Sequence, residues 1–316
     1  MTARGVLVVG DANPDLILAG DTVPRFGQAE QLLDSADLVI GGSAAIVACG
    51  LARLGIPTTL AAVVGDDSFG EFMTGRLADR GVDVSGIRID PDRATGLTVV
   101  LLKREDRGIL TLPGAIPELT ADDVLDAVES GHPAHVHFAS YYLQPRLAAQ
   151  LPALLDRLRH LGITTSIDTN WDPSETWQGM ADVLSRVDLF FPNREELIAI
   201  ARALGRAGDG SVEDAAGGLA EVGPRVVVKV GAAGGVTIDA GTITRAPGLT
   251  VDLVDTTGAG DSFDAGYLAA LSMGLPTEAD RLSWATSSGS LSVRGRGGTA
   301  AQATQDELER VARRPA

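Results

Sequence analysis

The residues best suited to chemistry lie in one run, Asp255-Thr-Thr-Gly-Ala-Gly-Asp-Ser-Phe-Asp-Ala-Gly266. An apolar stretch at 250–254, predicted to be a short strand, precedes the run, and apolar residues at helical spacing follow it as far as Gly274. The turn at 258–260 therefore leaves unpaired N–H groups at a helix N-terminus, which favours an anion such as phosphate. In the first helical turn, Asp261 can take a proton from a hydroxyl that attacks phosphorus. The alternative is that Asp261 only caps the helix.

This run resembles the C-terminal signature of the ribokinase-like (PfkB) carbohydrate kinases, a family that also includes adenosine kinases. The resemblance implies that Asp261 is the catalytic base. It also implies that Gly258, Ala259 and Gly260 form an anion hole for the transferred phosphoryl group. Further matches follow in the family's order, over about residues 4–300: Asn13-Pro-Asp15, Gly41-Gly42-Ser43, Val64-Gly-Asp-Asp-Ser-Phe-Gly70 and Asn193-Arg-Glu-Glu196.

Polar and small residues near the N-terminus indicate the acceptor site. Asn13 and Asp15 lie two apart after the first predicted strand, so their side chains share a direction. The resemblance makes both of them sugar contacts, since an amide and a carboxylate can bind hydroxyls. The alternative is a polar turn around the intervening proline. The resemblance adds Gly41 and Gly42, where the acceptor can approach the backbone.

One position departs from the family pattern. Ile46 stands where the N-terminal signature usually carries an Asn that contacts the sugar. An apolar side chain would leave a sugar hydroxyl unpaired, so either the acceptor lacks that hydroxyl or Ser43 supplies the bond. The alternative is that the helix is rotated and Ile46 lies in the core. Tyr141, at the end of another predicted strand, is a candidate floor for a sugar and equally a candidate core residue.

The nucleotide side draws on residues that follow other predicted strands. The predicted nucleotide-binding residues are Asp168, Asn170, Asn193, Lys229, Gly231, Gly234, Thr257 and Gly260. Lys229 can reach a phosphate from the end of its strand, or can simply be solvated. Asn193 and Glu196 share one helical face at i and i+3. The resemblance places this Asn near the phosphates and gives Glu196 the water shell of Mg²⁺; a capping box is the alternative.

The resemblance implies ATP and Mg²⁺ as cofactors. Family members often also bind K⁺ between the turn of Asp255 and Thr257 and a loop near 292–297. That loop is richer in Arg and Gly here than is usual in the family, so activation by a monovalent cation stays open.

The elements that must position these residues alternate along the chain. Apolar stretches at 6–9, 58–64, 135–139, 164–167, 189–191 and 226–230 predict buried strands, and amphipathic stretches at 44–54, 68–80, 121–129, 146–161, 194–204 and 212–221 predict helices. This order predicts an α/β fold, a three-layer α/β/α sandwich on a mostly parallel sheet. Excursions at about 12–40 and 96–112, the second resembling a hairpin around 104–108, break the alternation. The family resemblance implies that they pair as a small β-sheet lid, and an ordinary surface hairpin without a gating role is the alternative. A short helix is expected after residue 300.

Composition limits the partners. The chain has 316 residues, 45% of them hydrophobic, and is expected to form a single kinase domain over 1–316. A net charge of −16 disfavours nucleic acid and anionic membranes. The single Cys49 and the lack of a signal peptide or an apolar span favour a soluble protein of the cytoplasm. Expected partners are ATP, a sugar or nucleoside acceptor and, through the lid, a second copy of the chain.

Rival classes lack their motifs. A P-loop kinase needs Gly-Lys-Ser/Thr, and neither Lys103 nor Lys229 follows a glycine. A Rossmann dehydrogenase needs three glycines after its first strand, where Gly10 stands alone. A silent sugar or nucleotide sensor is disfavoured by the retained Asp261. A sugar acceptor is preferred over a nucleoside because Phe26 is the only aromatic residue in the first lid excursion.

Overall fold

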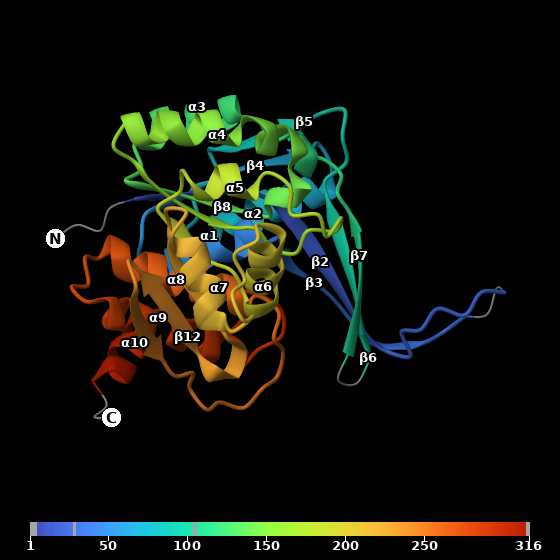
Figure 1. The fold of residues 1–316 in the computed structure, drawn as a ribbon. Coiled ribbons are helices and arrows are strands. Elements are labelled where there is room, and N and C mark those ends of the chain that lie inside the picture. The colour runs from blue at the N-terminus through green and yellow to red at the C-terminus, as the bar shows by residue number, and fades with distance from the viewer. Residues whose placement is uncertain (1–4, 28–29, 104–105, 314–316) are drawn as a thin grey trace.

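Two β-sheets organise the chain in the computed structural model, which describes residues 5–27, 30–103 and 106–313 (Figure 1). The larger sheet has nine strands in the order β13-β12-β11-β10-β9-β8-β1-β4-β5. Its strands are β1 Val6–Val9, β4 Thr58–Gly65, β5 Ile87–Asp90, β8 His135–Ala139, β9 Thr164–Asp168, β10 Leu189–Phe190, β11 Arg225–Lys229, β12 Gly235–Asp239 and β13 Thr242–Ala246. Neighbouring strands are parallel from β5 to β11, and β12 and β13 add an antiparallel edge.

Helices cover both faces of this sheet because its central strands are apolar on both sides. One hydrophobic cluster joins the sheet to α1 Ser43–Arg53, α2 Ser68–Ala78, α8 Ala259–Ser272, α9 Glu278–Ser292 and α10 Gln305–Ala312. A second cluster lies on the other face, with α3 Ala121–Gly131, α4 Pro145–His160, α5 Met180–Leu184, α6 Arg194–Ala203 and α7 Val212–Ala220. The predicted α/β/α layering is confirmed, and the predicted helix after residue 300 is α10.

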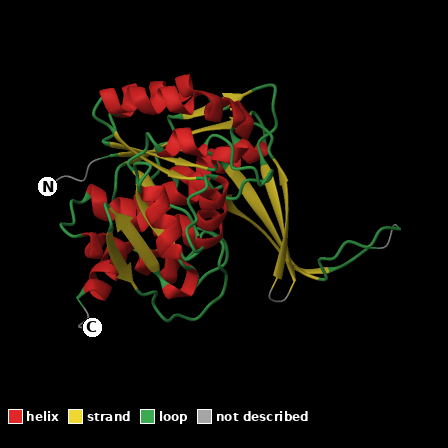
Figure 2. Ribbon diagram, viewed as in Figure 1, coloured by secondary structure: helices red, strands yellow, loops and turns green. Residues whose placement is uncertain are grey.

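The smaller sheet stands away from the helical body (Figure 2). Its strands are β2 Asn13–Gly20, β3 Leu33–Gly41, β6 Leu97–Lys103 and β7 Asp106–Leu112, in the order β3-β2-β6-β7. Both predicted excursions therefore pair with each other, β2 parallel to β6. The hairpin between β6 and β7 is confirmed by its strands, and its tip at 104–105 lies outside the described residues.

The prediction of a strand at 250–254 is wrong. Residues 247–258 form a loop between β13 and α8. Leu249, Val251 and Leu253 in this loop line a cavity. Their apolar side chains therefore form part of the cavity wall and do not belong to a strand of the sheet. The predicted helix after the loop is confirmed as α8, and Gly274 follows its end with a left-handed φ of 75°.

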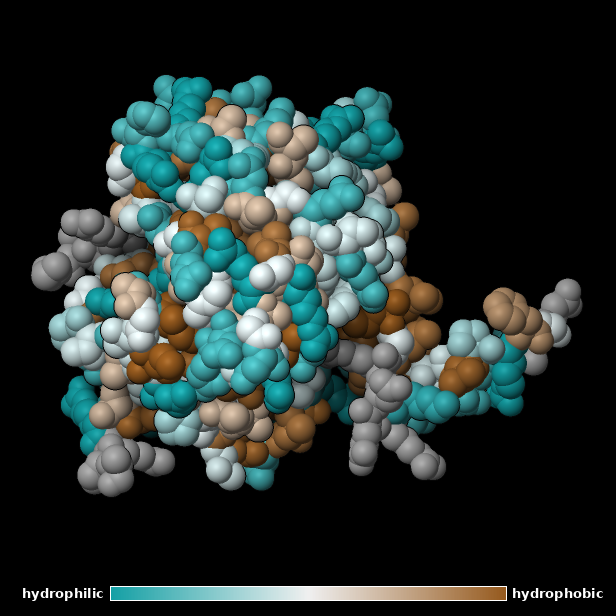
Figure 3. Space-filling view, viewed as in Figure 1, coloured by the Kyte–Doolittle hydropathy of each residue, from teal (hydrophilic) through white to brown (hydrophobic). Residues whose placement is uncertain are grey.

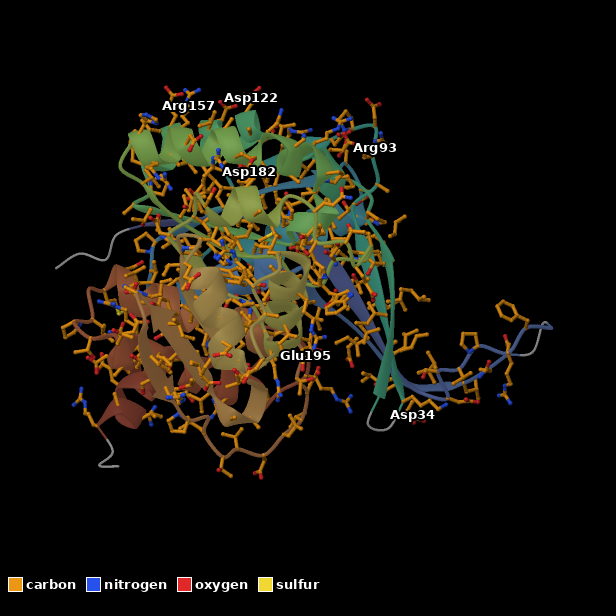
Figure 4. The ribbon with its side chains drawn as sticks, viewed as in Figure 1. Asp34, Arg93, Asp122, Arg157, Asp182 and Glu195 are labelled. Atoms are coloured by element: carbon orange, nitrogen blue, oxygen red, sulfur yellow. The ribbon has the colours of Figure 1, made fainter. Side chains whose placement is uncertain are left out.

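Charged side chains occupy the outer surfaces of the helices. Asp122, Arg157 and Asp182 project outward from α3, α4 and α5 (Figure 4). Within the described ranges, no helix combines the length and apolar character that crossing a membrane requires.

Candidate active site

The start of α8 offers backbone N–H groups to an anion. Gly258 holds a left-handed φ of 71° at the N-cap, and no side chain of the described residues caps the helix. The N–H of Ala259 donates to the carbonyl of Thr256 at 3.2 Å, which closes the turn. An uncapped helix N-terminus attracts an anion through its remaining N–H donors and the helix dipole, so the anion hole predicted at 258–260 stays a prediction that this turn allows.

Asp261 lies in the first turn of α8, half-buried, and its carboxylate accepts a hydrogen bond from the hydroxyl of Ser43. Desolvation raises the pKa of Asp261 from 3.8 to about 7. The Ser43 bond acts in the opposite direction, and the nearby charge of Asp168 raises the pKa further. A carboxyl with a pKa near neutrality is well matched to general base catalysis.

Four of the predicted acceptor residues, Asn13, Asp15, Gly41 and Gly42, lie together at the ends of β2 and β3. The amide of Asn13 donates to Oδ1 of Asp15 at 3.3 Å and to the hydroxyl of Thr98 on β6 at 3.1 Å. A Cβ on Gly41 would come within 1.9 Å of Oδ1 of Asp15, so only glycine allows this approach. Gly42 likewise lies against the backbone of residue 11 and the side chain of Asn13.

Ser43 and Ile46 face different parts of the site. Ser43, at the start of α1, donates a hydrogen bond to the carboxylate of Asp261 and so links the glycine pair Gly41 and Gly42 to the start of α8. Ile46 is 3% exposed and fits against two glycine-containing loops. A Cβ on Gly298 would lie 2.4 Å from Cδ1 of Ile46, and one on Gly258 would lie 3.1 Å from its Cγ2. The Ile46 side chain therefore packs against the turn at Gly258, where the anion hole is predicted.

Lys229 is enclosed by carboxylates. Its Nζ lies 2.6 Å from Oδ2 of Asp168 and 3.1 Å from Oδ2 of Asp264. The nearby ammonium keeps the pKa of Asp168 below its usual value despite burial, whereas desolvation raises that of Asp264. Desolvation likewise raises the pKa of Glu196 to about 7, with Asp168 adding to it. The solvated alternative for Lys229 is therefore wrong.

Asn193 and Glu196 form a capping box at the start of α6. Oδ1 of Asn193 accepts from the N–H of Glu196 at 2.9 Å, and Oε2 of Glu196 accepts from the N–H of Asn193 at 2.9 Å. Both predicted residues lie beside the carboxylate cluster, since Asp168 and Lys229 each contribute to the pKa of Glu196. The described residues contain no cluster of three or more His, Cys, Asp or Glu side chains suited to a metal ion.

A cavity of about 510 Å³ opens next to the anion hole. Its walls include Lys229, Gly231, Gly234, Leu249, Val251, Leu253, Gly260, Phe263 and Val293. The lining is mostly apolar and includes Lys229 and Gly260. An apolar cavity with a few polar groups is typical of a small-molecule site.

Three predicted residues have other local contacts. Asn170 accepts a hydrogen bond from the N–H of Ser140 at 3.0 Å and so joins the loops after β9 and β8. Tyr141 packs in the second hydrophobic cluster, on the sheet face opposite α8. The carboxylate of Asp255 accepts from the N–H groups of Thr257 and Gly297, both at 2.9 Å, which ties the two loops that the predicted K⁺ site would use.

Sequence reasoning missed three residues. The hydroxyl of Thr98, on β6, accepts a hydrogen bond from Asn13. The alternating residues at 98–102, which predict a strand, were the signal that could have pointed to it. Asp264 lies one helical turn after Asp261, inside the signature run. Asp11, directly after β1, accepts from the N–H of Ala44 at 3.0 Å and so anchors the start of α1.

Comparison with known proteins agrees with this arrangement. Residues 3–305 match the pfkB family of carbohydrate kinases. The fructokinase of Klebsiella pneumoniae is 32% identical over 325 residues, which cover 96% of this chain and 98% of that protein. The chain belongs to the pfkB family and is an ATP-dependent phosphotransferase.

Solved structures share the fold. The Arabidopsis thaliana ribokinase complexed with ribose and ATP superposes with a TM-score of 0.85 at 23% identity, covering 99% of this chain and 100% of that one. A double mutant of the Vibrio cholerae fructokinase, with fructose, ADP and potassium ion bound, has a TM-score of 0.81 at 26% identity, covering 98% and 99%.

Proposed function

We propose that this kinase transfers the γ-phosphoryl group of ATP to a primary hydroxyl of a sugar. In this reaction the acceptor oxygen forms a bond to the γ-phosphorus, the bond to the bridging oxygen of ADP breaks, and the acceptor proton passes to Asp261. The N–H groups of residues 258–260 stabilise the negative charge of the transferred group. Asn13, Asp15 and Thr98 orient the sugar beneath the lid.

The contact between Ser43 and Asp261 carries this proposal. A hydroxyl already donates to the carboxylate, from the side of the acceptor cluster. The acceptor hydroxyl needs the same position to lose its proton to Asp261 and to attack a phosphoryl group held at the start of α8. The raised pKa of Asp261, caused first by burial, is well matched to a general base and favours a kinase over a sensor.

A ligand screen followed by turnover tests the proposal. Melting temperature is measured with sugars and nucleosides in the presence of a non-hydrolysable ATP analogue and Mg²⁺, with fructose first because of the fructokinase relatives. Acceptors that raise the melting temperature are then assayed for ADP release. Turnover of a nucleoside alone would support the nucleoside-kinase alternative, and binding without any turnover would support the sensor.

We propose that Mg²⁺ binds near Lys229, which lines the cavity and contacts Asp168 and Asp264, with Glu196 close enough for the charges of Asp168 and Lys229 to act on it. A bound Mg²⁺ would neutralise charge on the phosphates. We propose that Glu196 holds its water shell through the carboxylate that also caps α6. K⁺ is proposed at the loops that Asp255 joins, and the similar Vibrio cholerae fructokinase was solved with potassium ion bound.

Replacing Glu196 by Gln is expected to raise the Mg²⁺ concentration for half-maximal activity, with little change in the acceptor KM. Glu195, its exposed neighbour on α6, points away into solvent (Figure 4) and gives the matched control Glu195→Gln. Magnesium titrations of both variants and the wild type provide the measurement. Identical titrations for Glu196→Gln and wild type would leave Glu196 with its capping role alone.

Replacing Ile46 by Asn is expected to lower the melting temperature and kcat without improving ribose relative to the native acceptor. The side chain packs on Gly258 and Gly298, so the new amide would be buried without a partner at a cost of about 1–3 kcal/mol. Ile46→Val is the control, because it keeps the apolar contact. A higher ribose-to-native ratio of kcat/KM in Ile46→Asn would instead make position 46 a wall of the acceptor site.

The outer face of the lid is apolar, and we propose that it joins two copies of the chain. Strand register places Leu38, Leu16, Val99 and Leu110 in one row across the sheet. Paired residues share a face, so this row and its neighbours form a surface opposite the acceptor residues, with Leu110 61% exposed. Apolar residues also gather at the lid side of the molecule in Figure 3.

Replacing Leu110 by Glu is expected to turn a dimer into a monomer, since a charge cannot be buried unpaired in an apolar interface. Sedimentation equilibrium of the wild type and of Leu110→Glu measures the mass. Leu161→Glu, at an exposed leucine after α4, is the control. A monomeric wild type would contradict the proposal.

A further inference from the structure

Asp264 is a buried carboxyl that the proposed reaction does not use. It follows Asp261 by one turn of α8 and is 0% exposed. Its Oδ2 lies 3.1 Å from Nζ of Lys229, and its Oδ1 has no hydrogen-bond partner among the described residues. A buried carboxyl with an unused acceptor lowers stability, which indicates that it serves the site.

The position of Lys229 shows what Asp264 does. Lys229 ends β11, its N–H donates to the carbonyl of Pro192 at 2.9 Å, and its side chain is 11% exposed. Asp168 binds the ammonium at 2.6 Å from the end of β9, while Asp264 binds it from α8. The flexible stem of the lysine is thus fixed at both ends, by backbone pairing and by two carboxylates on different elements.

This arrangement puts the ammonium beside Gly260, one of the residues of the proposed anion hole. A Cβ on Gly260 would lie 3.5 Å from Cδ of Lys229 and 3.7 Å from its Nζ. Lys229 and Gly260 also line the same cavity. If Asp264 were absent, Asp168 alone would hold the ammonium, and the side chain could rotate about that single contact away from Gly260.

We propose that Asp264 is a positioning residue which, together with Asp168, fixes the ammonium of Lys229 beside Gly260, where it faces the transferred phosphoryl group. The proposal rests on the kinase function proposed above. Lys229 stabilises the negative charge of the phosphoryl group, and Asp264 orients the Lys229 side chain for that contact. Misplacement of a charged group by about 1 Å is enough to lower a rate on the order of 10²-fold.

A double-mutant cycle tests the coupling. The variants are Asp264→Ala, Asp264→Asn, Lys229→Met and the double variant Asp264→Ala/Lys229→Met, each assayed for kcat, for the KM of ATP and acceptor, and for melting temperature. Lys229→Met is expected to lower kcat about 10²–10³-fold, as loss of a stabilising donor does. Asp264→Ala is expected to lower kcat roughly 10- to 100-fold with little change in the acceptor KM.

The coupling gives the decisive result. In the Lys229→Met background, Asp264→Ala should cost nothing further in kcat, because its effect acts through Lys229. Asp264→Asn should recover most of the loss, since the amide keeps the shape and its oxygen still accepts from the ammonium. Equal kcat losses from Asp264→Ala in both backgrounds would overturn the proposal. A lower melting temperature with a normal kcat in Asp264→Ala would also overturn the proposal, because Asp264 would then be purely structural.

Nucleotide affinity separates this proposal from the proposed function. Dissociation constants for ADP and for a non-hydrolysable ATP analogue, each with Mg²⁺, are measured by calorimetry on the same variants. Lys229→Met and Asp264→Ala should weaken the analogue more than ADP, because the ammonium faces the γ-phosphoryl position. If no acceptor is phosphorylated by the wild type, the proposed function fails, and the affinities still decide whether Asp264 acts through Lys229.

Discussion

Replacing Asp261 by Asn is expected to lower kcat about 10²–10⁴-fold, the usual cost of losing a general base. The amide keeps the size of the side chain and can still accept from Ser43, but it cannot take the acceptor's proton. The acceptor KM should change little, because the proposed sugar contacts come from Asn13 and Asp15. Steady-state kinetics with the identified acceptor provide the measurement. A kcat within a few-fold of wild type would mean that Asp261 is not the base.

The pH dependence provides a second measurement of the same residue. Because the pKa of Asp261 is about 7, kcat/KM of the wild type should fall tenfold per pH unit below that value, as the base becomes protonated. Burial raises this pKa above the unfolded value, so ionisation lowers the stability of the folded protein as pH rises from 3.8 to about 7. Asp261→Asn should therefore melt higher than wild type at pH 8, and the difference should shrink toward pH 4.

Replacing Gly258 by Ala is expected to lower kcat on the order of 10²–10³-fold, the usual effect of losing a donor at such a site. The new Cβ would lie 2.6 Å from Cα of Gly298 and 2.9 Å from its carbonyl oxygen, so the turn must move. Movement of the turn shifts the N–H groups that we propose hold the phosphoryl group. Assays of kcat and of affinity for a non-hydrolysable ATP analogue give the measurement.

A second glycine provides a control that separates the displacement of the turn from the strain of a left-handed backbone. Gly81 has a φ of 81° after α2, and a Cβ there would meet nothing within 4 Å. Gly81→Ala should therefore lose stability to a degree similar to Gly258→Ala through its left-handed backbone, yet keep its kcat. Normal kcat in Gly258→Ala would show that the turn tolerates the shift and that the anion is held elsewhere.

The sequence alone predicted the layered fold, because its strands and helices differ in period and length. Short apolar runs such as 58–64 are typical of buried strands, and amphipathic runs such as 146–161 are typical of helices that cover a sheet. The start of α8 was also predictable, because a Gly-Ala-Gly turn followed by a carboxylate and by apolar residues at helical spacing indicates a helix N-terminus. The stretch at 250–254 was misread because apolar residues lining a ligand cavity look like a strand in one dimension.

The partners of the side chains were decided only by the tertiary structure. Ser43 and Asp261 are 218 residues apart, and Lys229 and Asp168 are 61 apart, so no local period links them. Whether Ile46 faces the acceptor or the turn depended on the rotation of α1, which the contact with Gly298 fixes. Local sequence determines which backbone forms and which residues can do chemistry, because those preferences act within a few residues. Charge environment and pairing depend on distances across the sheet, which exist only once the chain has folded.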